Sequence, residues 1–272
     1  MNRYFINLVR LSVKSIVRIS KKLPSFVESD MKLLQGKGWG AATVDFEAWE
    51  GLRFLKESGI QNPIVIDIGA NVGNYSRAIL RLAPTAQIYA FEPSAAARGE
   101  LERLFVNDSR VSISAFALSS EKGSRILWSD FAGSGLTSLS QRRLDHFGID
   151  FSHEEQVQVT TLDAWNVDHQ LEPDLIKIDV EGHELDVLKG AGAILEFAKV
   201  VQFEFGGCNI DSRTFFQDFW YFFQSIGFRI FRITPSGATE VTSYNEDDEY
   251  FRTTNYLAVR ERAQDQKLNF LA

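Results

Sequence analysis

Cysteine, long apolar runs and positive charge are all scarce in this chain, and each shortage excludes a class of protein. The 272 residues include one cysteine, Cys208, which excludes an intramolecular disulfide and a cysteine-cluster zinc site and fits a reducing cytosol best. No apolar run reaches the roughly 18–20 residues that span a bilayer. Acidic residues outnumber basic ones by 36 to 29, and this net charge of −7 argues against nucleic acid as the main partner.

The residues that are present have the composition of a soluble globular protein. Hydrophobic residues make up 44% of the chain and charged residues 24%, which argues against disorder and low-complexity architectures. The length suits one large domain or two small ones with a sizeable core.

The acidic excess is uneven along the chain. Six basic residues precede the first acidic residue, Glu28, so the remainder holds 23 basic and 36 acidic residues, a net charge of −13. Apolar and basic side chains of residues 1–22 fall on opposite faces at about 100° per residue, which predicts a basic amphipathic helix. Such a helix can dock on its own domain, on a second copy of the chain or on the inner surface of an anionic membrane. A cleaved signal fits less well, because no separate apolar region precedes a small-residue cleavage site.

The remaining pattern predicts an α/β protein with a doubly wound sheet. We divide the chain into the basic helix (1–30), a helical cap (31–60), an α/β domain (61–262) and a tail (263–272). The order of strands and helices predicts parallel strands joined by right-handed crossovers. Strands are expected over 64–68, 88–91, 111–118, 175–180 and 200–205, and helices over 46–58, 73–82, 95–105 and 184–188.

The second half of the domain is less regular. Residues 119–160 are rich in Gly and Ser and predict a hairpin near 125–128, and residues 133–151 can fold over an acceptor as a lid. An aromatic-rich helix is expected over 214–225, with most of its rings in the core, and two closing strands over 228–233 and 256–259.

A glycine-containing turn follows the first predicted strand, where a doubly wound sheet binds its ligands. The turn reads Asp67-Ile68-Gly69-Ala70-Asn71-Val72-Gly73. It departs from the dinucleotide pattern G-x-G-x-x-G because Asn71 stands where the second glycine makes room for a pyrophosphate. Glu92, at the end of the second strand, is placed to accept both hydroxyls of a ribose. Together these features predict an adenosyl ligand without phosphate, for which S-adenosylmethionine is the obvious candidate.

Several other catalytic motifs are missing. The chain has no Gly-Lys-Ser or Gly-Lys-Thr P-loop, no G-x-S-x-G nucleophile elbow and no second histidine to complete a zincin helix after His183-Glu184. A nicotinamide-dependent oxidoreductase and a non-catalytic, membrane-associated scaffold stay open as alternatives, although Asn71 argues against the first and the intact cofactor turn against the second.

The chain resembles the FkbM-type S-adenosylmethionine-dependent methyltransferases over about residues 61–206, and less closely to about 260. The resemblance is carried by Ile66–Gly73, Phe91-Glu92-Pro93, Thr161-Leu162-Asp163, Leu188–Ala191 and above all Lys177–Glu184, with the sequence Lys-Ile-Asp-Val-Glu-Gly-His-Glu. It implies the class I methyltransferase fold, a seven-stranded sheet with its last strand antiparallel, and O-methylation, commonly of sugar or polyketide hydroxyls. Related proteins often carry a polar residue where Phe116 stands.

The expected site residues follow from the turn and from this resemblance. Cofactor binding is assigned to Asp67, Gly69, Ala70, Asn71, Gly73, Glu92, Ala117 and Asp179. The catalytic candidates are Asp179, Glu181, His183 and Glu204. Asp179 holds the methionine amino group or orients the acceptor, Glu181 or His183 acts as the base, and Glu204 binds the acceptor.

Simpler roles compete with these assignments. Asp179 and Glu181 can cap a helix, and His183 can face solvent from the first turn of its helix. Asp179, Glu181 and Glu204 can also hold a divalent cation such as Mg²⁺, although none is predicted. The expected partner is a small-molecule or glycan acceptor, and the sequence leaves the oligomeric state open.

Overall fold

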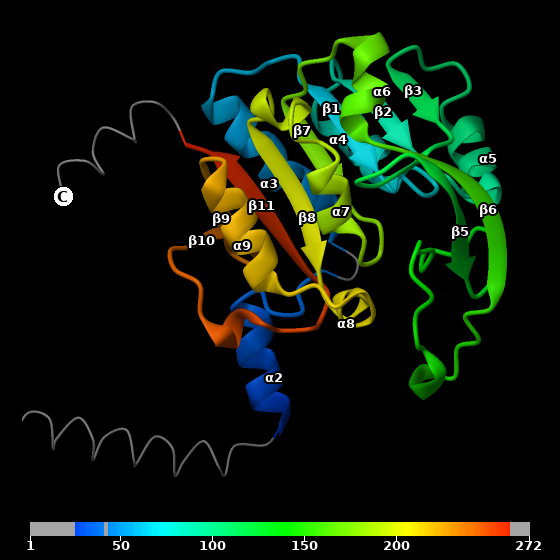
Figure 1. The fold of residues 1–272 in the computed structure, drawn as a ribbon. Helices are drawn as coiled ribbons and strands as arrows, with labels where there is room; N and C mark the ends of the chain where they lie inside the picture. Colours follow the sequence, from blue (N-terminus) through cyan, green and yellow to red (C-terminus); the bar gives the residue numbers. More distant parts are fainter. Residues whose placement is uncertain (1–24, 41–42, 262–272) are drawn as a thin grey trace, which may run out of the picture.

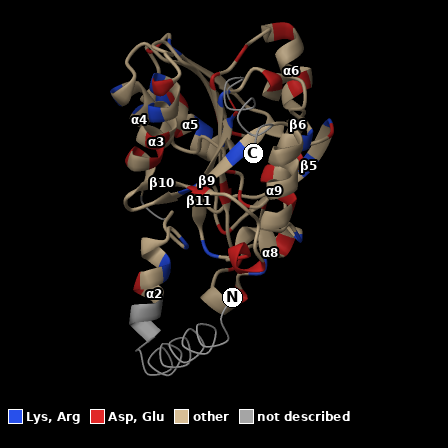
Figure 2. Ribbon diagram, turned by 90° about the vertical axis from the view of Figure 1, so that its left-hand side faces the viewer, with Lys and Arg blue, Asp and Glu red and all other residues tan. Residues whose placement is uncertain are grey.

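The computed structural model describes residues 25–40 and 43–261 (Figure 1). The predicted basic helix over residues 1–22 and the predicted tail over 263–272 lie outside the described residues. Helix α2 (Ser25–Leu34) projects from the body of the molecule and crosses the boundary placed at residue 30 (Figures 1 and 2). No helix in the described ranges is both long and apolar enough to cross a membrane.

The main sheet has eight strands in the order β10-β9-β11-β8-β7-β1-β2-β3. Strands β1 (Ile64–Ile68), β2 (Gln87–Phe91), β3 (Val111–Ser114), β7 (Leu175–Ile178) and β8 (Val200–Phe205) are parallel. Strand β11 (Thr254–Arg260) is antiparallel to both β8 and β9 (Phe228–Thr234). The doubly wound sheet is confirmed. The expected seven strands are one too few, because β10 (Gly237–Val241) forms a hairpin with β9.

Helices cover both faces of this sheet. Helices α3 (Val44–Glu57), α4 (Asn74–Leu82) and α5 (Ala95–Leu104) pack apolar side chains on one face. The other face is covered by α6 (Leu162–His169), α7 (Glu184–Lys189) and α9 (Phe216–Ser225). In α9, Phe216, Phe219 and Phe223 are fully buried and Trp220 nearly so, as expected for a core helix. Helix α8 (Cys208–Ser212) lies between β8 and α9 in the chain.

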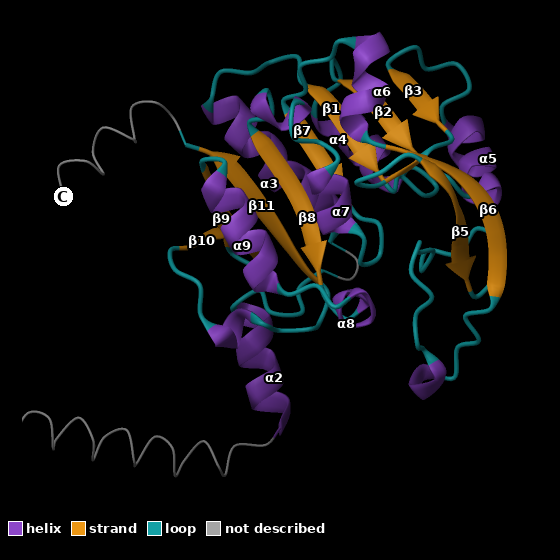
Figure 3. Cartoon of the chain, in the orientation of Figure 1, coloured by secondary structure: helices purple, strands orange, loops and turns teal. Residues whose placement is uncertain are grey.

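A second, three-stranded sheet stands beside the edge of the first (Figure 3). Its order is β4-β6-β5, with β4 (Ala117–Leu118), β6 (His153–Thr160) and β5 (Gly123–Ser129). The single strand predicted over 111–118 is therefore wrong: its first part, β3, belongs to the main sheet, and Ala117–Leu118 pair with β6. The hairpin expected near 125–128 is a long antiparallel pair, and residues 130–152 form an excursion between its strands.

Candidate functional site

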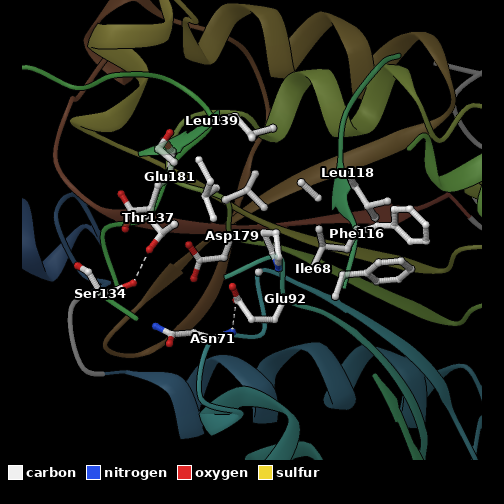
Figure 4. A pocket seen from close by; sticks show the side chains of 18 of the residues that line it. Ile68, Asn71, Glu92, Phe116, Leu118, Ser134, Thr137, Leu139, Asp179 and Glu181 are labelled. Atoms are coloured by element: carbon white, nitrogen blue, oxygen red, sulfur yellow. Dashed lines mark hydrogen bonds between the residues drawn. The ribbon is translucent and has the colours of Figure 1, made fainter. Parts of the chain in front are cut away.

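A cavity of about 150 Å³ lies at the carboxyl ends of β1, β2, β7 and β8. The main sheet contributes turn residues and carboxylates to its wall, and the second sheet and the excursion close the other side (Figure 4). Of the expected cofactor residues, Gly69, Asn71, Glu92, Ala117 and Asp179 line it.

The turn after β1 is shaped by close contact with the chain that follows β7. Gly69 has a φ of +78°, and a Cβ at this position would lie 1.8 Å from the carbonyl oxygen of Asp179. Gly73, the N-cap of α4, has a φ of +88°, and a Cβ there would lie 2.7 Å from Leu101 Cδ1. The contact at Gly69 is with backbone, so only glycine fits there and the loops after β1 and β7 meet at this point, whereas Gly73 is favoured by its left-handed backbone.

Glu92 fixes the turn and faces the cavity at the same time (Figure 4). Its Oε2 accepts a hydrogen bond from the Asn71 amide at 2.8 Å, and its Oε1 accepts one from the Ser94 amide at 2.8 Å. Burial raises the pKa of Glu92 to about 7. Each carboxylate oxygen keeps a second lone pair, so Glu92 can still accept hydrogen bonds from two hydroxyl groups.

Asn71 presents an unsatisfied polar atom at the same wall. Its side-chain Oδ1 is buried without a hydrogen-bond partner among the described residues, and its backbone has a φ of +48°. Buried polar atoms in folded proteins nearly always have a partner. A ligand with a hydrogen-bond donor would satisfy this oxygen.

The loop after β7, residues 179–183, is held by the fully buried side chain of Glu184. Glu184 Oε1 accepts hydrogen bonds from the amides of Val180 at 3.1 Å and Gly182 at 3.0 Å. Glu181 has a φ of +54° and Gly182 a φ of +98°. Because the backbone is fixed in this form, both Asp179 and Glu181 line the cavity.

Three carboxylates, those of Asp179, Glu181 and Glu204, line the cavity at the ends of β7 and β8. The first two have a cationic partner. Asp179 Oδ2 lies 3.1 Å from Lys177 Nζ, and Glu181 Oε2 lies 2.5 Å from Arg142 Nη1. In residues 25–40 and 43–261, Glu204 has neither a hydrogen bond nor an ion pair through its side chain. Burial and the neighbouring Asp179 raise the pKa of Glu181 to about 8 and that of Glu204 well above its usual range.

Two expected catalytic and binding residues point elsewhere. His183 is absent from the cavity wall: it is 6% exposed, and its Nε2 lies 2.9 Å from Ser119 Oγ. It is therefore not the solvent-facing residue considered as the alternative, and burial lowers its pKa. Asp67 is fully buried behind the turn, where its Oδ2 accepts a hydrogen bond from Ser76 Oγ at 2.7 Å. Ala70 and Gly73 shape the turn without lining the cavity.

The excursion, residues 130–152, also forms part of the cavity wall. The sequence predicted that residues 133–151 can fold over an acceptor but did not identify the residues that line the cavity. Ser134, Gly135 and Thr137–Leu139 line the cavity, and Ser138 Oγ donates to the carbonyl oxygen of Glu181 at 2.8 Å. Phe116 also lines it, with 39% of the residue exposed. Sequence reasoning missed Arg142, because nothing in the chain links it to Glu181, 39 residues away.

A possible metal-ligand set differs from the one considered in the sequence. Ligand atoms of Glu181, Glu204 and Cys208 lie within 4.8 Å of one another, whereas Asp179 is not part of this group. Arg142 already supplies a cation to Glu181, so the group does not need a metal ion to balance all of its charge.

The chain is similar to known methyltransferases. A family model described as a methyltransferase FkbM domain matches residues 67–230. The 2-O-methyltransferase NoeI of Sinorhizobium fredii is 31% identical over 156 residues, covering 53% of this chain and 63% of that protein. The hexuronic acid methyltransferase AglP of Haloferax volcanii is 26% identical over 157 residues, covering 55% of this chain and 59% of that protein.

These curated relatives are matched over only about three fifths of their length. A crystal structure of methyltransferase FkbM from Methylobacillus flagellatus is similar with a TM-score of 0.46 and 16% identity, covering 72% of this chain and 44% of that one.

Proposed function

Because the chain belongs to the FkbM methyltransferase family, we propose that it transfers a methyl group from S-adenosylmethionine to a hydroxyl group of a sugar or glycan. The observation that carries the proposal is the cavity, which has Glu92 and Asn71 along one wall and three carboxylates at the other. Neither an oxidoreductase nor a non-catalytic scaffold is supported by the matched family.

The cavity wall suits an adenosyl ligand with a charged amino acid tail. Glu92 binds the ribose hydroxyls, the unsatisfied Oδ1 of Asn71 accepts a donor group, and the exposed ring of Phe116 packs on the adenine together with Ala117. Asp179 binds the ammonium group. The chemistry that S-adenosylmethionine supplies when bound is a methyl group activated by a positively charged sulfur.

Glu204 and Glu181 act on the acceptor hydroxyl. Glu204, which lacks a cationic partner in the described structure, accepts in its ionised form the proton that leaves the acceptor hydroxyl as its oxygen attacks, and its raised pKa makes that form the stronger base. Glu181, held by Arg142 and by a strained backbone, orients that hydroxyl. General-base catalysis of this kind contributes typically 10²–10⁴-fold. Alignment of the hydroxyl by the cavity walls supplies a further part of the barrier, roughly 7–11 kcal/mol in well-oriented systems.

The acceptor wall favours a polyhydroxyl compound. A carboxyl group accepts hydrogen bonds when it is ionised and both donates and accepts them when it is protonated, so Glu181 and Glu204 suit sugar hydroxyls in either state. The names of two relatives, a 2-O-methyltransferase and a hexuronic acid methyltransferase, support a sugar acceptor. The basic residues 1–22 would bring the enzyme to an anionic membrane surface, and a divalent cation at Glu181 and Glu204 is a second option for activating the hydroxyl.

Titration calorimetry of the full chain with S-adenosylmethionine tests the cofactor assignment. We expect a dissociation constant in the micromolar range, and binding no tighter than millimolar would contradict it. Mass spectrometry of glycans from cells with and without the protein tests the acceptor, with a gain of one methyl group expected. Adding a chelator to the assay tests the cation, since an unchanged rate would exclude it.

A further inference from the structure

A charged lysine lies in the middle of the main sheet. Lys177 of β7 is 5% exposed, and the strand register places it between Asp67 of β1 and Gln202 of β8. Its Nζ lies 3.1 Å from Asp179 Oδ2 and 3.8 Å from Asp67 Oδ1. Taking an ammonium group out of water costs several kcal/mol, so its presence needs a reason beyond packing.

The position of Lys177 follows a gradient along the sheet face that α3 and α4 cover. Alternate residues of a strand share one face, and on this face the side chains become more polar toward the carboxyl edge. The rows that show it are Val65–Asp67, Leu175–Lys177–Asp179 and Val200–Gln202–Glu204. On this face Lys177 is thus the last residue of β7, and Asp179, two residues further on, lines the cavity.

Neighbouring side chains hold the ammonium group in place. The ring of Tyr75 lies 5.1 Å from Lys177 Nζ, within range of a cation–π interaction. Tyr75 donates a hydrogen bond to Gln202 Oε1 at 2.8 Å, and Gln202 Nε2 donates to Glu47 Oε2 at 3.0 Å. The network joins α3 and α4 to the sheet and fixes the ring against which the lysine rests.

The charges of Lys177, Asp67 and Asp179 do not cancel, so one more cation would neutralise them. Burial alone would lower the pKa of Lys177, but the carboxylates of Asp179 and Asp67 outweigh it and raise the pKa, so the lysine stays charged. With both aspartates ionised, the three groups carry one excess negative charge. Asp179 is the member that reaches the cavity, with 36% of its side chain exposed, so a ligand cation would balance the charge there.

We propose that Lys177 is a positioning residue that holds the carboxylate of Asp179 in one orientation, so that its free carboxylate oxygen binds the ammonium group of the cofactor. This inference rests on the proposed function. Lys177 does not line the cavity and acts only through Asp179. The lysine holds one oxygen of the carboxylate, and the other is left for the ligand.

The test is calorimetric binding of S-adenosylmethionine to the full-length Lys177→Met variant. Without the lysine, Asp179 loses the ion-pair partner that orients its carboxylate, so binding should weaken by about tenfold or more. Lys177→Arg keeps the charge and should stay within about threefold of wild type. Lys189→Met is the matched control, because it removes an exposed lysine from an ion pair with Asp186, and neither residue lines the cavity; we expect nearly unchanged binding.

A double-mutant cycle separates this role from a purely structural one. In an Asp179→Asn background, Lys177→Met should change the affinity by less than about twofold. Equal losses in Lys177→Met and Lys189→Met would overturn the proposal, as would wild-type binding by a folded Lys177→Met variant. If that variant does not fold, Asp67→Asn with Lys177→Met takes its place, because it removes both members of the buried pair. A wild-type chain that binds no S-adenosylmethionine would instead contradict the proposed function itself.

Discussion

The guanidinium of Arg142 lies 2.5 Å from the carboxylate of Glu181 and joins the excursion to the loop after β7. The same guanidinium lies 3.7 Å from Asp211 in α8. Only 10% of the Arg142 side chain is exposed, so the pair is largely shielded from solvent. This contact holds the second sheet against the carboxylate end of the cavity, and it predicts how the rate depends on pH.

Replacing Arg142 by Met should shift the pH profile of methyl transfer. Burial and Asp179 raise the pKa of Glu181, whereas Arg142 lowers it. Removing the arginine therefore raises that pKa further, and the rise of kcat with pH should move to higher pH. Because Glu181 and Glu204 interact, the shift belongs to the pair. Arg142→Lys should move it less. An unchanged pH profile of kcat in a folded variant would show that Arg142 does not influence the carboxylates that act in catalysis.

Glu204→Gln should lower kcat by about 10²–10⁴-fold, the usual contribution of a general base. The affinity for S-adenosylmethionine should stay near that of wild type, because the proposed mechanism assigns Glu204 to the acceptor and not to the cofactor. Single-turnover rates and calorimetry together give this separation. Glu121→Gln, an exposed residue in the turn before β5, serves as the control. If kcat survives in Glu204→Gln and falls in Glu181→Gln, the two roles are reversed.

Glu92→Ala should weaken S-adenosylmethionine binding by at least about 1.5 kcal/mol, the scale of a hydrogen bond to a charged group. The matched variant is Glu100→Ala, on the exposed side of α5, which should bind normally. Calorimetry gives both affinities. Equal affinity in the two variants would place the ribose elsewhere in the cavity.

The sequence predicted the first half of this site better than the second. Gly69 and Glu92 line the cavity, as expected, because a strand-to-helix turn and a strand end fix their positions within a few residues. The assignment of His183 as a base had no such support: only the fold shows that its ring turns toward Ser119 rather than the cavity. Arg142 gave no signal at all, since its contact with Glu181 depends on how two sheets pack.

The stability of the protein should depend on pH through Glu184. Burial raises its pKa to about 7 from a usual value of 4.5. The folded protein therefore binds more protons than the unfolded chain between these values, and stability should fall as pH rises from about 4.5 to about 7. A shift of this size corresponds to up to about 3 kcal/mol. Glu184→Gln keeps an acceptor for the amides of Val180 and Gly182 but cannot ionise, so denaturant unfolding should show a flatter pH dependence. An equally steep dependence would assign the effect to other buried carboxyls.

Two glycines with similar backbone conformations allow the stability cost of the close contact at Gly69 to be separated from the cost of backbone strain. Gly59 and Gly69 have nearly the same φ, +82° and +78°, but a Cβ at Gly59 would have no neighbour within 4 Å. Gly59→Ala should cost about 1 kcal/mol, the cost of a left-handed conformation alone. Gly69→Ala adds a clash with the carbonyl oxygen of Asp179, so the loss of stability should be well above that value, with weaker cofactor binding. Thermal unfolding of both variants compares them directly. Equal losses would mean that the loops after β1 and β7 can separate without cost, and that Asp179 is not held from this side.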